Sequence, residues 1–134
     1  MLSSAINESG ISEWVHLLGQ RTDISRLTAA LDIASSTSIC GEAFSNTVGE
    51  AMACAIPCVV TDVGDSAMIV GKAGIVVHPG DHNAICNAWH ELITMGIQGR
   101  MTIGQAARQR VQENYSLTKV TKQYQELYSD ILHL

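Results

Sequence analysis

Apolar residues along the chain fall into short continuous runs that alternate with stretches of helical spacing. The short runs are bounded by glycine, proline or small polar residues, which is typical of strands buried in a sheet. Four such runs predict strands, at residues 14–18, 33–39, 58–60 and 74–77. The second run is rich in serine and threonine, as expected where helices pack closely on both faces of a sheet.

The other segments carry apolar residues three or four positions apart, which predicts amphipathic helices. These helices are expected at residues 24–31, 45–55, 66–70, 83–94, 97–113 and 117–133. Pro57 ends the second of them, and Asp81 is a good N-cap for the fourth. Strands that alternate with helices predict a parallel α/β fold. We therefore expect a Rossmann-like sheet of about four to five strands with helices on both faces.

Length and composition indicate one domain with an aliphatic core. The chain has 134 residues, of which 46% are hydrophobic and only 4% are aromatic. Residues 1–12 are small and polar and are expected to be frayed, which leaves residues 13–134 as the folded domain. The two tryptophans, Trp14 and Trp89, are expected to be packing anchors.

Charge and cysteine content exclude several classes of protein. The formal net charge of −5 argues against a nucleic-acid partner, because such proteins present basic patches. The four cysteines match no common zinc pattern, so we expect free, reduced thiols that mostly lie in the core. The start of the chain resembles no signal peptide, and no stretch reaches the roughly 20 apolar residues of a membrane span. These features favour a soluble, cytoplasmic protein. The arginines between residues 100 and 110 are expected on a solvated helix face.

The candidate chemistry lies where the second predicted strand gives way to a helix. Glu42 follows that strand and Glu50 lies inside the helix. Ligands of parallel sheets bind outside the carboxyl ends of the strands, and carboxylates accept hydrogen bonds from sugar hydroxyls. The N–H groups of Ser45, Asn46 and Thr47 at the helix start favour an anion such as a diphosphate. The groups suit a sugar nucleotide, although two glutamates at this spacing are also common on solvated surfaces.

The run from Glu42 to Asp65, EAFSNTVGEAMACAIPCVVTDVGD, resembles the retaining glycosyltransferases of group 1 (family 4). The likeness begins at about residue 13 and reaches the end of the chain. Its other parts are residues 15–19, 27–33, 74–81 and the last two predicted helices. The family has the two-domain GT-B architecture, and the resemblance implies that this chain is the carboxyl-terminal, donor-binding domain.

The resemblance also implies a role for each residue of the corner. Glu42 would be the catalytic residue that contacts the donor sugar and stabilises it as it reacts. Glu50 would hold the ribose hydroxyls of the nucleotide. Backbone N–H groups would be offered to the sugar and the diphosphate by Phe44, Ser45, Asn46 and Thr47. No cofactor and no metal ion are expected, because the family is usually metal-independent.

Two further sites follow from the same resemblance. Gln20 and Arg21 would lie beside the nucleotide base. Ala43 would lie against the sugar, where the family usually has glycine, and its methyl group would narrow the choice of donor. Ala55 also stands where the family often has glycine. If its φ angle is positive, alanine costs about 1 kcal/mol there.

The partner expected from the resemblance is a UDP-, GDP- or ADP-sugar, with a glycan or lipid as acceptor. The acceptor would be bound by an amino-terminal domain for which this chain has no room, so the chain alone is expected not to transfer sugar. Any membrane contact would be peripheral and confined to the full enzyme. Tyr124, Leu127, Tyr128 and Leu132 are expected to form an uncovered apolar patch that favours self-association. The alternative is a degenerate, non-catalytic binding or assembly module.

Overall fold

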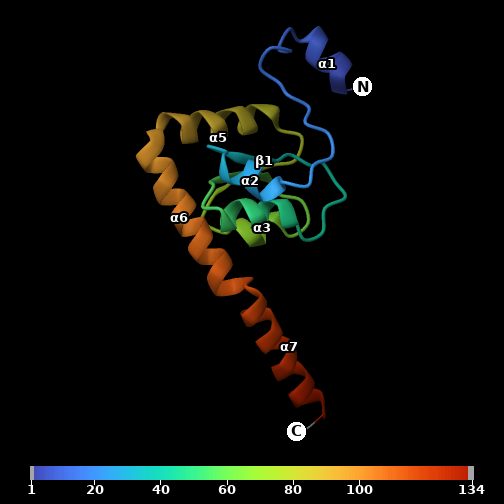
Figure 1. Cartoon of the computed structure of the whole chain (residues 1–134), viewed down its shortest axis with the longest axis vertical. Helices are drawn as coiled ribbons and strands as arrows, with labels where there is room; N and C mark the ends of the chain where they lie inside the picture. The colour runs from blue at the N-terminus through green and yellow to red at the C-terminus, as the bar shows by residue number, and fades with distance from the viewer. Residues whose placement is uncertain (1, 133–134) are drawn as a thin grey trace.

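The computed structural model describes residues 2–132 and contains a three-stranded parallel sheet in the order β1-β2-β3 (Figure 1). The strands are β1 (Ala34–Ser36), β2 (Cys58–Thr61) and β3 (Ile75–Val77). The helices are α1 (Leu2–Glu8), α2 (Ile24–Ala29), α3 (Asn46–Ala53), α4 (Ser66–Val70), α5 (His82–Thr94), α6 (Gly96–Asn114) and α7 (Leu117–Leu132). The alternation confirms the parallel α/β class, with three strands in place of the expected four to five.

The central strand β2 organises the core. Ala34 of β1 is in register with Cys58, and Thr61 is in register with Val77 of β3. All four residues of β2 are buried, because helices cover both faces of the strand.

Successive residues of β2 point to opposite faces of the sheet. Val60 packs in a cluster with residues of α3 and α4, which include Met52 and Ile69. Val59 packs in a second cluster with residues of α5, which include Ile85 and Leu92. Helices on both faces of the sheet are therefore confirmed.

The end of α3 is a Schellman motif that places an alanine in the left-handed region. Ile56 N donates to Ala51 O (3.0 Å), and Ala55 N donates to Met52 O (2.9 Å). Ala55 has a φ of +61°, the one positive φ of a non-glycine residue within residues 2–132. Pro57 follows and prevents the helix from continuing. The residue therefore adopts the positive φ for which the sequence predicted a cost.

Replacing Ala55 with glycine is expected to raise the free energy of unfolding by about 0.5–1 kcal/mol. The relief of left-handed strain exceeds the extra chain entropy that glycine brings to the unfolded state. Urea unfolding measures the change. The matched control is Ala53→Gly, at an exposed helical position of α3, which should lower stability by about 1 kcal/mol. A loss of stability in Ala55→Gly would contradict the prediction that the positive φ of Ala55 destabilises the protein.

Two expectations for the amino-terminal part are wrong. Residues 14–18 form no strand, and Trp14 is 82% exposed, so it is no packing anchor. An apolar run becomes a strand only where a neighbouring strand is available for pairing, and local pattern does not reveal that. In the segment that was expected to be frayed, Leu2–Glu8 form α1, which buries Ile6.

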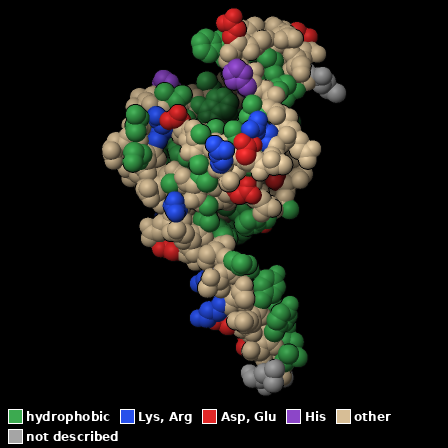
Figure 2. All heavy atoms as spheres, viewed as in Figure 1, with side chains coloured by type: hydrophobic (Ala, Val, Ile, Leu, Met, Phe, Trp, Pro, Cys, Tyr) green, Lys and Arg blue, Asp and Glu red, His purple; other side chains and the backbone are tan. Residues whose placement is uncertain are grey.

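Helix α7 projects away from the sheet, toward the end of the molecule opposite α1 (Figure 1). The helix has no buried residue, and Figure 2 shows hydrophobic side chains along one side of it. The expected patch of Tyr124, Leu127, Tyr128 and Leu132 is confirmed as exposed, with half or more of each residue accessible. Self-association through this patch stays a prediction. None of the helices within residues 2–132 is both long and apolar enough to cross a membrane.

Two expectations about polar groups need correction. Arg110 is not simply solvated, because its guanidinium donates to Ile69 O (2.8 Å) and Met68 O (2.6 Å) and ties α6 to α4. The four cysteines are free, but Cys40 and Cys86 are exposed and do not lie in the core. Burial raises the pKa of the Cys58 thiol to about 12, so this thiol stays protonated and inert at neutral pH.

Candidate functional site

The loops after β1 and β2 meet at the carboxyl edge of the sheet. β1 ends at Ser36 and β2 ends at Thr61, and the two strands are parallel neighbours. The loop after β1 leads through Glu42 to α3, whose N-cap is Ser45. The predicted corner is therefore placed where ligands of parallel sheets bind.

A short hydrogen-bonded chain holds the half-buried side chain of Glu42. Ser38 Oγ donates to Glu42 Oε1 (3.0 Å). Thr61 Oγ1, at the end of β2, donates to the backbone oxygen of Ser38 (2.7 Å). The carboxylate at the edge of the sheet is thus connected to the central strand.

The backbone beside Glu42 is held from the other side by the loop after β2. Asp65 N donates to Ala43 O (2.9 Å). Gly64 has a φ of +57°, and a Cβ at this position would lie 2.6 Å from Ala43 O. This close approach requires glycine, which lets the second loop pack on the first.

The first turn of α3 supplies free backbone donors. The first helical hydrogen bond runs from Gly49 N to Ser45 O (3.2 Å). Helix geometry therefore leaves the N–H groups of Asn46, Thr47 and Val48 without partners inside the helix. Asn46 and Thr47 are exposed residues, and free N–H groups at the start of a helix are suited to an anion.

Glu50 lies on α3 at a pocket of about 230 Å³. Phe44 and Asn46 also line this pocket, and Val111 and Tyr115 of the α6 end close it. The rings of Phe44 and Tyr115 meet edge to face, with centroids 5.6 Å apart. The pocket is thus open to a planar or polyhydroxyl group beside an exposed carboxylate.

The loop at residues 19–21 is not joined to the corner by hydrogen bonds of the described residues. Arg21 instead forms a bidentate ion pair with Asp23, with Nε and Nη2 at 2.7 and 2.8 Å from the two carboxylate oxygens. This pair raises the pKa of Arg21 and lowers the pKa of Asp23. Gln20 is exposed. The place of Gln20 and Arg21 beside a nucleotide base stays a prediction. So does the convergence of Glu42 and Glu50 on one cleft, because Glu42 is held by Ser38 and Glu50 lies at the pocket with Phe44 and Tyr115.

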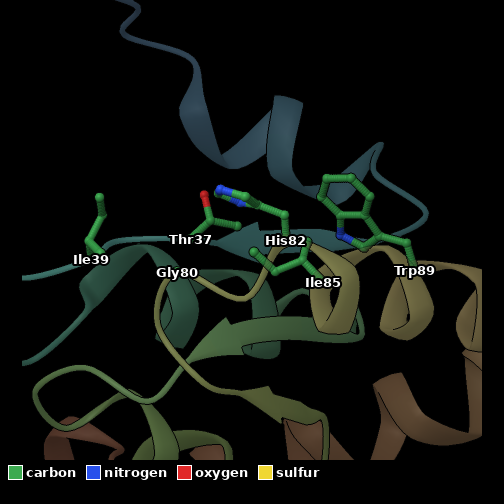
Figure 3. A pocket seen from close by; sticks show the side chains of 6 residues that line it. All are labelled: Thr37, Ile39, Gly80, His82, Ile85 and Trp89. Atoms are coloured by element: carbon green, nitrogen blue, oxygen red, sulfur yellow. The ribbon is translucent and has the colours of Figure 1, made fainter.

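A second pocket, of about 320 Å³, lies beside β1 on the α5 side of the sheet (Figure 3). It is lined by Thr37, Ile39, Gly80, His82, Ile85 and Trp89. Trp89 is 41% exposed and donates from Nε1 to Ser35 Oγ (2.8 Å). Figure 3 shows Ile39 and Trp89 at opposite ends of this space. Trp89 is therefore a pocket wall and not the packing anchor that was expected.

Several residues that hold the corner were not predicted from the sequence. Ser38 and Thr61 hold Glu42, and Gly64 packs on its neighbour. The short distance of Ser38 from Glu42 along the chain was a usable signal. Tyr115 lies far away in sequence, and no local pattern links it to Phe44. Residues 2–132 contain no group of three His, Cys, Asp or Glu side chains that could hold a metal ion.

A parallel sheet covered by helices on both faces defines a Rossmann-like domain, and the acidic strand–loop–helix corner lies at its carboxyl edge. Comparison with known proteins gives the family. The chain belongs to the family described as "Glycosyl transferases group 1", whose family model matches residues 2–95.

Individual relatives support this assignment. The chain is 30% identical over 124 residues to N-acetyl-alpha-D-glucosaminyl L-malate synthase of Bacillus anthracis, covering 91% of this chain and 32% of the relative. A glycosyltransferase structure from Rickettsia africae ESF-5 matches with a TM-score of 0.91 and 26% identity, covering 98% of this chain and 35% of the other.

Structures of the Anabaena protein HepE match in complex with UDP (TM-score 0.90) and with UDP-glucose (TM-score 0.84). In both matches the identity is 28%, and the alignment covers 96% of this chain and 36% of HepE. The chain therefore spans about a third of the length of these relatives.

Proposed function

We propose that this domain binds the nucleotide-sugar donor of a glycosyltransferase that transfers a hexose to a glycan or lipid acceptor with retention of configuration. The single observation that carries the proposal is the corner itself. It combines a held carboxylate at Glu42, free N–H groups at the start of α3, and Glu50 beside a pocket.

Each part of a nucleotide sugar has a chemically suitable group in the proposal. Glu42 accepts hydrogen bonds from hydroxyls of the sugar and stabilises the charge that develops on it. The N–H groups of Asn46 and Thr47 face the diphosphate at the positive end of the α3 dipole. Glu50 accepts from the ribose hydroxyls.

The remaining predicted residues complete the proposed site. Ala43, Phe44 and Ser45 form the loop wall against the sugar and diphosphate, and Gln20 and Arg21 lie beside the base. The Arg21–Asp23 pair is exposed, so the arginine can exchange partners at little cost when an anion binds. Support for a uridine nucleotide comes from HepE, which was solved with UDP and with UDP-glucose.

We further propose that these 134 residues bind the donor without transferring its sugar. Transfer requires an acceptor held against the donor in one geometry. The relatives are about three times as long as this chain, which leaves ample length in them for an acceptor site.

Titration with nucleotides tests donor binding. We expect UDP and UDP-glucose to raise the melting temperature saturably, while glucose and inorganic phosphate leave it unchanged. A ligand at 100 times its Kd adds about 2.7 kcal/mol of stability, which shifts the midpoint by several degrees. GDP- and ADP-glucose, run alongside, identify the base that the site prefers. The absence of any shift with all of these nucleotides would favour the alternative of a non-catalytic assembly module.

A further inference from the structure

We propose that Thr61 and Ser38 position the side chain of Glu42, so that its Oε2 atom is the oxygen presented to the donor sugar. The proposal rests on the proposed function, because it assigns the supports of the carboxylate that contacts the sugar. Thr61 and Ser38 act through Glu42 and are positioning residues. Neither belongs to the corner predicted from the sequence.

Thr61 anchors this series of contacts in the sheet. Thr61 is the last residue of the central strand and is only 2% exposed. Its hydroxyl donates to Ser38 O (2.7 Å) and lies 3.4 Å from Ser36 O. Because β2 is paired on both sides, this hydroxyl connects the loop after β1 to the central strand of the sheet. The backbone at Ser38 is held there.

Ser38 in turn contacts the carboxylate. Ser38 Oγ donates its single proton to Glu42 Oε1 at 3.0 Å. One carboxylate oxygen is thereby engaged inside the half-buried loop. The second oxygen, Oε2, keeps its lone pairs for a hydroxyl of the ligand.

The backbone that follows Glu42 is held by the loop after β2. Asp65 N donates to Ala43 O (2.9 Å), and Gly64 packs directly on the same carbonyl group. The loop is therefore fixed on both sides of Glu42. The main freedom left to this residue is rotation of its side chain, and the hydroxyl of Ser38 restricts that rotation.

Two pairs of matched variants test the assignment. Ser38→Ala and Thr61→Val each remove a hydroxyl, whereas Ser38→Thr and Thr61→Ser keep one. For each variant, calorimetry gives the Kd for UDP and for UDP-glucose. We expect Ser38→Ala and Thr61→Val each to weaken UDP-glucose about tenfold relative to UDP. Ser38→Ala removes the hydrogen bond to the carboxylate, and Thr61→Val removes the one that holds the backbone of Ser38, so in both variants Glu42 is no longer held toward the sugar. The hydroxyl-keeping variants should retain the wild-type ratio.

A measurement without ligand separates this proposal from the proposed function. NMR relaxation of the Glu42 methylene carbons reports how mobile this side chain is. It should be restricted in the wild type and in the hydroxyl-keeping variants Ser38→Thr and Thr61→Ser. It should be mobile in Ser38→Ala and Thr61→Val. Equal mobility in all of these proteins would overturn the positioning role, as would an equal loss of UDP and UDP-glucose affinity. A restricted Glu42 in a wild-type protein that binds no nucleotide would overturn the proposed function alone.

Discussion

Replacing Glu50 with alanine is expected to weaken binding of UDP at least tenfold. A carboxylate that accepts from two adjacent ribose hydroxyls forms two charge-assisted hydrogen bonds, each worth about 1.5–3 kcal/mol. Glu50 is exposed on α3 beside the pocket, and alanine is the best helix former, so the fold should not suffer. Isothermal titration calorimetry with UDP measures the change in Kd directly.

Two controls isolate the role of the carboxylate at this position. Glu91→Ala removes an exposed helical glutamate from α5, on the other face of the sheet, and should leave the Kd for UDP unchanged. Glu50→Gln keeps a neutral acceptor and should show an intermediate loss. If the wild type binds UDP and Glu50→Ala binds it equally well, the ribose lies elsewhere and the assignment of Glu50 is wrong.

Replacing Gly104 with alanine is expected to lower the free energy of unfolding by about 3 kcal/mol, at the upper end of the usual cost of overpacking. A Cβ at Gly104 of α6 would lie on the carbonyl oxygen of Ala55 and 2.8 Å from its carbonyl carbon. The neighbour is backbone in a tight turn and not a flexible side chain, so it cannot move aside cheaply. Urea unfolding and calorimetry should both show the loss, with a melting temperature lower by roughly 10 °C.

The control for this change is Gly49→Ala, in α3. No atom lies within 4 Å of a Cβ at Gly49, so alanine there should raise stability by up to about 1 kcal/mol through helix propensity. Because α6 also carries Val111 to the pocket, displacement of α6 should weaken nucleotide binding as well. Wild-type stability of Gly104→Ala would mean that α6 does not rest on the turn at Ala55.

The candidate site was partly predictable from the chain alone. The alternation of elements predicted a strand–loop–helix corner, and Glu42 does lie in the loop between β1 and α3. The binding roles of the two glutamates stay predictions. The contact of Thr61 with Ser38 was not predictable, since Ser38 lies in the loop after β1 and Thr61 ends β2. Only the pairing of β1 with β2 brings them into contact.

By itself the sequence determined the local features of this protein. The buried strand at residues 58–60, the cap at Asp81 and the end of α3 before Pro57 depend on hydrophobic period, side-chain capping and backbone restriction, which act over a few residues. Asp81 Oδ1 does accept from Ala84 N at 2.8 Å. The parallel α/β class followed from the order of such elements.

The tertiary structure decided what depends on contact between distant segments. Residues 14–18 are apolar enough for a strand, but no strand of the described residues pairs with them. Tyr115 meets Phe44, and Gly104 meets Ala55, only because α6 crosses over α3. Strand pairing, the close approach of two helices and the walls of a pocket each depend on two segments that meet in space. A pattern along the chain describes one segment and does not show which other segment it meets.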